Sequence, residues 1–209
     1  MSTRRSRKTR VATTAAVAAG ALLPAVLAAP RSSGDGLSLD AAERLCRDSG
    51  LGGWELVDFA AQLVSEQFQA HSLWHLWEKP ASAMRNRRGW AGQYNLALDA
   101  LLRRLGFDTL LVHASRVRGL GANPWWQAGH TWVRVVIDGR MRDVTAARGR
   151  DGGLATVTAV TEVRPVHVWT LPSVTAALAP ISAYQAWKHL VTREPVPTWM
   201  YRRLDLTDD

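Results

Sequence analysis

A strong helix signal followed by a β-hairpin signal constrains the fold more than any other feature of the sequence. In residues 92–105, apolar side chains fall on one helical face at Leu96, Ala97, Ala100, Leu101 and Leu105. Gly106 is a typical C-terminal stop. Two strand-like segments, 131–137 and 140–145, are separated by Asp138-Gly139, the strongest kind of two-residue hairpin signal. We therefore predict an α+β fold in which a central helix packs on an antiparallel sheet.

Weaker patterns on both sides extend this prediction. Further helices are predicted over 41–46, with Ser38 or Asp40 as the cap, over 54–71 and over 175–191. Further strands are predicted over 109–117 and within 157–171, where Pro165 favours an edge position. A chain of 209 residues is long enough for one domain with a substantial core. We expect a single domain over 37–209.

The first 36 residues differ from the rest. Five cations lie within residues 4–10, nineteen uncharged residues follow at 11–29, and Val26-Leu27-Ala28 is a small-residue pattern. This order is typical of a secretory signal, cleaved after Ala28 or kept as an anchor. The apolar stretch is mostly alanine, so the alternative is a disordered extension of a cytoplasmic protein. We favour export or membrane anchoring, with membrane association through this segment.

Charge and cysteine content exclude several classes of function. The net charge is +8, but five cations and no acids lie in the first ten residues, so residues 11–209 carry only +3. A nucleic-acid partner is therefore not expected. Cys46 is the single cysteine, which excludes an internal disulfide and a cysteine zinc cage, and we expect it to be structural. His71 and His75 are four residues apart but suit packing better than metal binding, and no cofactor motif is present.

The start of the 92–105 helix is the best place for chemistry. Backbone N–H groups converge near residues 90–92 and stabilise an anion, so a cysteine there would be rich in thiolate. His130 begins the first hairpin strand and Asp143 lies on the second. A thiol, a histidine and a carboxylate in this arrangement would form a Cys-His-Asp relay.

Three segments carry a family resemblance. Residues 86–95 (NRRGWAGQYN), running into 101–107, resemble the segment of transglutaminase-like proteins and arylamine N-acetyltransferases in which the nucleophilic cysteine begins a central helix. Residues 129–140 (GHTWVRVVIDGR) resemble the histidine strand and hairpin of the same superfamily, and Asp143 resembles its aspartate. The match covers about residues 54–146. It implies a papain-like fold and a family of acyltransferases and cysteine hydrolases.

Two departures from the family pattern affect the predicted site. The cysteine position is occupied by Ala91, which has no nucleophile. The family aspartate usually lies about six residues after the hairpin glycine, where this chain has Thr145, whereas Asp143 comes four residues after Gly139. The predicted remnant site is Ala91, His130 and Asp143, with the pairing of the last two in question.

Residues around this site predict what it binds. Ten tryptophans are present, and several cluster near the motif segments, which favours an aromatic groove; the alternative is a tryptophan-rich core. We predict that the ligand is lined by Arg88, Trp90, Gln93 and Trp126. The favoured function is a non-catalytic domain that binds a peptide, acyl or aromatic ligand. The alternative is an active acyltransferase or cysteine hydrolase in which Ala91 is an isolated replacement.

Overall fold

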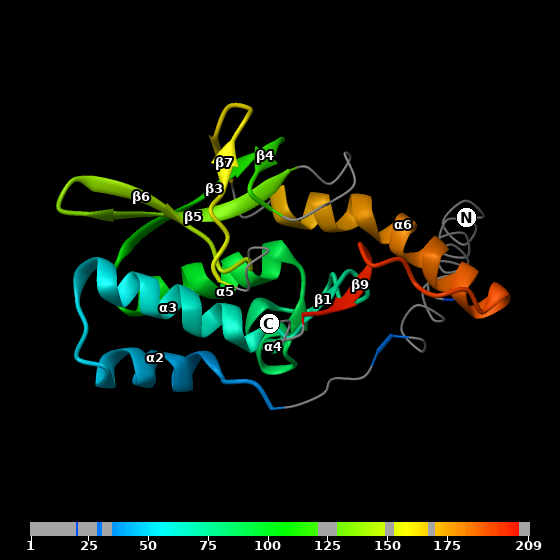
Figure 1. Ribbon diagram of the computed structural model, residues 1–209, viewed down its shortest axis with the longest axis horizontal. Helices are drawn as coiled ribbons and strands as arrows, with labels where there is room; N and C mark the ends of the chain where they lie inside the picture. The colour runs from blue at the N-terminus through cyan, green and yellow to red at the C-terminus, as the bar shows by residue number, and fades with distance from the viewer. Residues whose placement is uncertain are drawn as a thin grey trace, which may run out of the picture.

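The computed structural model describes residues 20, 29–30, 35–120, 129–148, 153–166 and 170–204. They form a mixed α+β structure, as predicted (Figure 1). The helices are α2 (Leu39–Asp48), α3 (Gly53–Gln67), α4 (Pro80–Arg85), α5 (Ala91–Arg104) and α6 (Thr170–Thr192). The strands are β1 (Ala70–Ser72), β2 (Arg88–Gly89), β3 (Asp108–Ala114), β4 (Val117–Arg118), β5 (His130–Ile137), β6 (Arg140–Val144), β7 (Thr158–Ala159), β8 (Arg164–Pro165) and β9 (Tyr201–Arg203).

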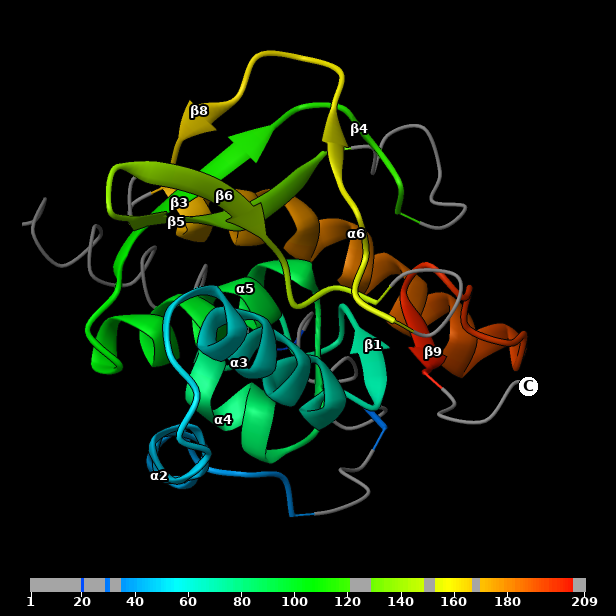
Figure 2. The ribbon, with the colours of Figure 1, turned by 60° about the vertical axis from the view of Figure 1, so that its left-hand side comes forward.

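Helix α5 is the centre of the main core. It lies between the other N-terminal helices and the sheet that contains β3, β5 and β6 (Figure 2). Its side chains Ala97, Leu98, Leu101 and Leu102 are fully buried and share one apolar cluster with Leu111, Val133 and Val135 of the sheet. The predicted central helix on an antiparallel sheet is therefore confirmed. The face that packs is shifted from the predicted one, because Leu98 and Leu102 are buried whereas the predicted Leu96, Ala100 and Leu105 are only half-buried.

The main sheet is antiparallel and has the order β6-β5-β3-β8. Asp138 and Gly139 have φ of 48° and 74°, the pair of left-handed conformations that a tight hairpin turn requires. The predicted hairpin is confirmed by the pairing of Val135 with Arg142. Strand β8 lies at the edge of the sheet, as Pro165 predicted.

Of two predicted helices, one begins where expected and the other ends early. Helix α2 begins where expected, because the Ser38 hydroxyl accepts a hydrogen bond from the Ala41 N–H at 3.1 Å. The helix predicted over 54–71 ends early, at Gln67, and Phe68 is extended. Residues 70–72 form β1, which pairs with β2 and β9. Pairing with two segments far along the chain overrides the local helical pattern here.

A second, smaller core lies under α6, which contains the predicted 175–191 helix. It comprises Leu73, Trp74, Leu76, Ala186 and Met200, with partly buried apolar neighbours that include Ala29, Trp90 and Leu178. Among the helices in the described part of the chain, none is both long and apolar enough to cross a bilayer. The two cores meet at the start of α5, since Trp90 belongs to one and Ala91 packs against the other.

Candidate functional site

The N-terminus of α5 is covered by an indole ring. Trp90 is the N-cap residue, and its backbone N–H donates to Oε1 of Gln93 at 3.1 Å. A Cβ on Gly92 would lie 2.8 Å from the Trp90 ring, so glycine is needed for this close approach. Ala91, the first residue of the helix, is half-buried. The position predicted for a nucleophile therefore presents a methyl group beside a tryptophan.

His130 is held by a hydroxyl group and not by a carboxylate. Its side chain is buried, and Nε2 lies 3.1 Å from Oγ1 of Thr145. The Thr145 hydroxyl donates to Oδ1 of Asn95 at 3.1 Å, so its single proton is used there. His130 must then be the donor, with the proton on Nε2. Its Nδ1 is left as the basic nitrogen.

Asn95 connects the start of the helix to the start of the strand. It is fully buried, and its Nδ2 donates to the carbonyls of Ala91 at 3.1 Å and Thr131 at 2.8 Å. Its Oδ1 accepts from Thr145 and from the Ala146 N–H at 3.0 Å. All the hydrogen-bonding capacity of this amide is thus satisfied. One side chain brings Ala91, Thr145 and, through Thr145, His130 into a single site.

The environment keeps His130 uncharged at neutral pH. Burial, together with a smaller effect of the nearby His113, lowers the pKa of His130 from 6.5 to about 4. The ring also stacks on Trp132, with centroids 6.0 Å apart. A paired carboxylate would act in the opposite direction and raise the pKa. The imidazole is therefore a neutral group, and none of the described residues gives it a negative partner.

The carboxylate of Asp143 pairs with an arginine and not with His130. Its carboxylate forms a bidentate ion pair with Arg134, with Oδ1 2.7 Å from Nε and Oδ2 3.0 Å from Nη2. The two residues lie directly opposite each other on β6 and β5. The expected role of Asp143 as the partner of His130 is corrected, because Thr145, two residues further on, reaches the histidine.

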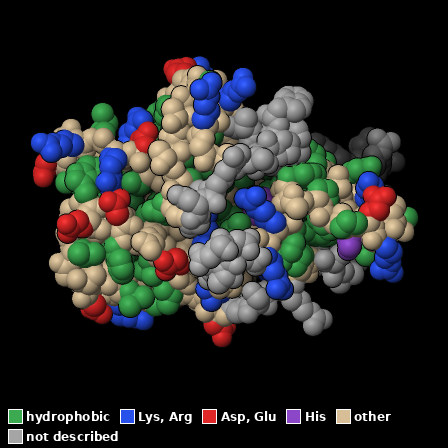
Figure 3. Space-filling model, in the orientation of Figure 1, with side chains coloured by type: hydrophobic (Ala, Val, Ile, Leu, Met, Phe, Trp, Pro, Cys, Tyr) green, Lys and Arg blue, Asp and Glu red, His purple; other side chains and the backbone are tan. Residues whose placement is uncertain are grey.

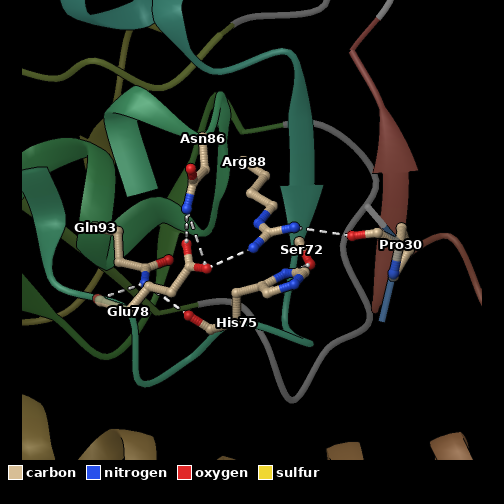
Figure 4. A network of polar contacts seen from close by, with 7 residues as sticks. All are labelled: Pro30, Ser72, His75, Glu78, Asn86, Arg88 and Gln93. Atoms are coloured by element: carbon tan, nitrogen blue, oxygen red, sulfur yellow. Dashed lines mark hydrogen bonds and ion pairs between the residues drawn. The ribbon is translucent and has the colours of Figure 1, made fainter. Parts of the chain in front are cut away.

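Two residues predicted to line a ligand have structural contacts instead (Figure 4). Arg88 forms an ion pair with Glu78 at 2.6 Å and donates to the Pro30 carbonyl at 2.9 Å. Gln93 Nε2 donates to the carbonyls of His75 and Glu78, both at 2.8 Å. These contacts hold the segment before α4 against the start of α5. The two Nη groups of Arg88 and the side-chain amide of Gln93 are therefore engaged within the chain, whereas the buried Nε of Arg88 has no partner among the described residues.

The described tryptophans occupy both buried and exposed positions. Trp74 is buried in the second core, as a tryptophan-rich core predicts, whereas Trp77 is 50% exposed. Trp90 lies beside Ala91, and its indole N–H is buried without a partner among the described residues. Trp126 lies outside the described residues.

A cavity of about 240 Å³ adjoins the site. Its lining combines the charged side chains of Asp58, Arg142 and Asp143 with Trp132, Val144, Thr145, Leu154, Ala155, Thr156 and Val157. Thr145 is shared with the His130 site, and the buried indole N–H of Trp132 has no partner among the described residues. The sequence does not predict this cavity, because residues 154–157 approach the strands only through the tertiary fold. Trp132 follows His130 by two residues, so strand alternation was the available signal.

The described residues do not form a metal-binding cluster. No group of three or more histidine, cysteine or acidic side chains in the described ranges is placed to hold a metal ion. His71 instead bonds to the Tyr94 hydroxyl and to the Trp199 carbonyl.

No protein-family model matches the chain, and no curated protein matches its sequence. The site is interpreted from its own residues.

Proposed function

We propose that this protein is a non-catalytic domain of transglutaminase-like, papain-like fold that binds a small peptide, acyl or aromatic ligand in the remnant of a Cys-His-Asp site. The observation that carries the proposal is the hydrogen-bonded chain from His130 through Thr145 and Asn95 to Ala91. It joins the start of β5, the residue after β6 and the start of α5 in one cluster, to which Ala91 contributes its backbone carbonyl. The nucleophile and the acid have been replaced by groups that cannot perform their steps.

The chemistry of the three positions supports this proposal over the active alternative. Ala91 supplies a methyl group, so no acyl-enzyme bond can form there. Thr145 contacts His130 at the position where a relay needs a carboxylate to stabilise an imidazolium, and a hydroxyl carries no charge. Ala91 is therefore not an isolated replacement. Two changes in one relay fit a protein in which catalysis is no longer used.

The cavity supports ligand binding. About 240 Å³ is slightly below the usual volume of pockets for drug-sized ligands, roughly 300–1,000 Å³, and suits a short acyl chain, one aromatic ring or one peptide side chain. Apolar atoms of Leu154, Ala155 and Val157 line part of it. The unpartnered Trp132 N–H would donate to a carbonyl or ether oxygen of such a ligand. Amide, ester and aromatic ether groups all have this chemistry.

Reinstalling the missing groups tests the relay. In the full chain, Ala91→Cys should give a thiol whose pKa is below the ordinary value of about 8.5, measured from the pH dependence of iodoacetamide alkylation. Ala91→Cys with Thr145→Asp should react faster still at neutral pH, because the carboxylate favours the thiolate–imidazolium pair. Cys46 is fully buried, so the unsubstituted protein supplies the background rate. Turnover of p-nitrophenyl acetate by the unsubstituted protein, abolished by His130→Ala, would overturn the proposal.

Ligand binding is tested by filling the cavity. Three probes represent the expected classes: acetyl-glutaminyl-glycine amide, butyramide and 4-methoxyaniline. Binding of at least one should change the tryptophan fluorescence, and Ala155→Leu should abolish the change because the added atoms occupy the cavity. Ala177→Leu, on the exposed surface of α6, is the matched control and should leave it intact. Failure of all three probes to bind would contradict the ligand-binding part of the proposal.

A further inference from the structure

Strand β6 has a free edge. It pairs with β5 on one side and lies at the end of the sheet order β6-β5-β3-β8 (Figure 2). The two-residue turn makes Ile137 and Arg140 the first hydrogen-bonded pair of the hairpin, and bonded and unbonded pairs alternate from there. The backbone N–H and C=O groups of Met141 and Asp143 therefore point away from β5. None of the described residues forms a backbone hydrogen bond with these four groups.

The opposite edge of the same sheet is unsuited to pairing. Strand β8 is only two residues long, and its Pro165 has no N–H to donate to a further strand. Strand β6 is five residues long and contains no proline. An added strand is therefore accommodated at β6 and not at β8.

Two of the three charged side chains of β6 do not shield this edge. Charges on an edge strand often project outward and prevent pairing with another chain. Arg142 instead lies over the Trp54 ring of α3, 4.6 Å from its centroid, and forms an ion pair with Asp58. Asp143 is paired across the hairpin with Arg134. Figure 3 shows basic and acidic side chains next to one another over this hairpin and α3, so the backbone of the edge stays accessible.

The free edge leads into the cavity of about 240 Å³. The lining of the cavity includes Asp143 and Val144 of β6 and the segment 154–157. This segment pairs with the chain beyond β6, where the Ala155 N–H donates to the Ala147 carbonyl at 2.8 Å, and then continues to β7, which pairs with β4. The cavity thus lies between the end of β6 and a segment that leaves the edge of the sheet.

We propose that the ligand of the cavity is an extended peptide that pairs with the free edge of β6 as an added strand. The proposal rests on the ligand-binding function proposed above and selects the peptide from its three ligand classes. In the antiparallel arrangement, two peptide residues exchange backbone hydrogen bonds with Met141 and Asp143. The peptide residue opposite Val144 places its side chain on the strand face of Arg142 and Val144, which both line the cavity.

A second copy of this chain fits the edge less well. In two-fold antiparallel pairing of β6 with itself, the outward groups can join Met141 to Asp143, Met141 to Met141, or Asp143 to Asp143. These registers place Arg142 opposite Arg142, Arg140 opposite Arg142, and Asp143 opposite Asp143, respectively. Like charges directly opposite each other destabilise a strand pair. A peptide without cations at these positions avoids the repulsion.

Calorimetric titration of the full chain with acetyl-Leu-Thr-Gln-Thr-Ser-amide tests the pairing. The two threonines of this probe lie opposite Asp143 and Met141, and its leucine lies beside the cavity. N-methylation of either threonine removes a donor that faces β6 and should lower the affinity at least about five-fold. N-methylation of the glutamine, whose N–H faces away from β6, is the matched control and should leave the affinity within about two-fold. Equal losses for the two kinds of peptide, or no binding of the parent peptide, would overturn the proposal.

Matched protein variants act on the same edge. Met141→Pro removes an N–H that points away from β5 and should lower the peptide affinity at least about five-fold. Met141→Ala removes the same exposed side chain but keeps the N–H, and it should bind the peptide as the unsubstituted protein does. Circular dichroism checks that both variants are folded, and the N-methylated peptides decide the matter if Met141→Pro is not.

Small probes separate this proposal from the one on which it rests. Butyramide and 4-methoxyaniline occupy the cavity without pairing with β6, so both Met141 variants should still bind them. Binding of either probe by a protein that does not bind the peptide would overturn the edge proposal alone, whereas failure of both probes and the peptide would overturn ligand binding as well. A doubling of mass in solution that Met141→Pro removes, without peptide binding, would identify a second copy as the occupant.

Discussion

The ring Nε2 of His130 donates a hydrogen bond of 3.1 Å to the hydroxyl of Thr145. Thr145 comes two residues after Asp143, the acid on β6. This pair orients the imidazole without giving it a negative partner. Burial consequently lowers the pKa of His130, and none of the described residues raises it again. The site is built to hold a neutral histidine.

Thr145→Val should destabilise the protein by about 1–3 kcal/mol, because the substitution leaves the buried groups of Asn95 and His130 without their partner. Urea unfolding followed by circular dichroism measures the change. Thr158→Val, at an exposed position of β7, is the control and should stay within about 0.5 kcal/mol of the unsubstituted protein. Equal effects of the two substitutions would mean that the Thr145 contacts contribute little.

Asn95→Leu should cost more, about 2–4 kcal/mol. It keeps the approximate volume but leaves the carbonyls of Ala91 and Thr131 and the N–H of Ala146 unpaired in the interior. The same unfolding measurement applies. A loss smaller than that of Thr145→Val would contradict the central position assigned to Asn95.

Asp143→Ala should change stability by less than about 1 kcal/mol, since its ion pair with Arg134 is partly exposed to solvent. In the Ala91→Cys background it should also leave the alkylation rate of the new thiol unchanged. A marked slowing of that reaction would restore Asp143 to the site and contradict the pairing of His130 with Thr145.

Gly92→Ala should destabilise the protein by about 1–3 kcal/mol although alanine favours helices, because the new methyl group overlaps the Trp90 ring. A blue or red shift of tryptophan emission should accompany the loss as the ring moves. Gly52→Ala adds a methyl group where no atom lies within 4 Å, and its emission spectrum should be unchanged.

Stability should fall as the pH is lowered from 6.5 to 4. The unfolded chain binds a proton at His130 below pH 6.5, whereas the folded protein does so only near pH 4, so protonation favours unfolding in this window. His71 and His75, whose pKa values are also lowered to about 4 by burial, act in the same direction. The contribution of His130 is on the order of 3 kcal/mol at its maximum.

His130→Gln tests this dependence. Urea unfolding at several pH values should give a shallower decline for the variant than for the unsubstituted protein, although the variant is the less stable of the two at pH 7.5. Parallel curves would show that His130 is protonated equally in the folded and unfolded states.

Local sequence patterns determined the main elements of this protein. The helix over 92–105, the Asp138-Gly139 turn, the Ser38 cap and the edge position of Pro165 all appear in the structure as predicted, although the buried face of the helix is shifted toward Leu98 and Leu102. Each depends on interactions among residues close in the chain or on the conformational range of one residue. Such features can therefore be predicted from the sequence of the segment itself.

The contacts of the site were decided by the tertiary structure. Asp143 and Thr145 share a strand face in the sequence pattern, and only the register of β5 and β6 places Asp143 opposite Arg134. Arg88 and Gln93 meet Glu78 because the segment before α4 folds back onto α5. Residues 70–72 form a strand because β2 and β9 provide partners. Which distant segments pair depends on how whole helices and strands pack, and this cannot be predicted from a local sequence pattern.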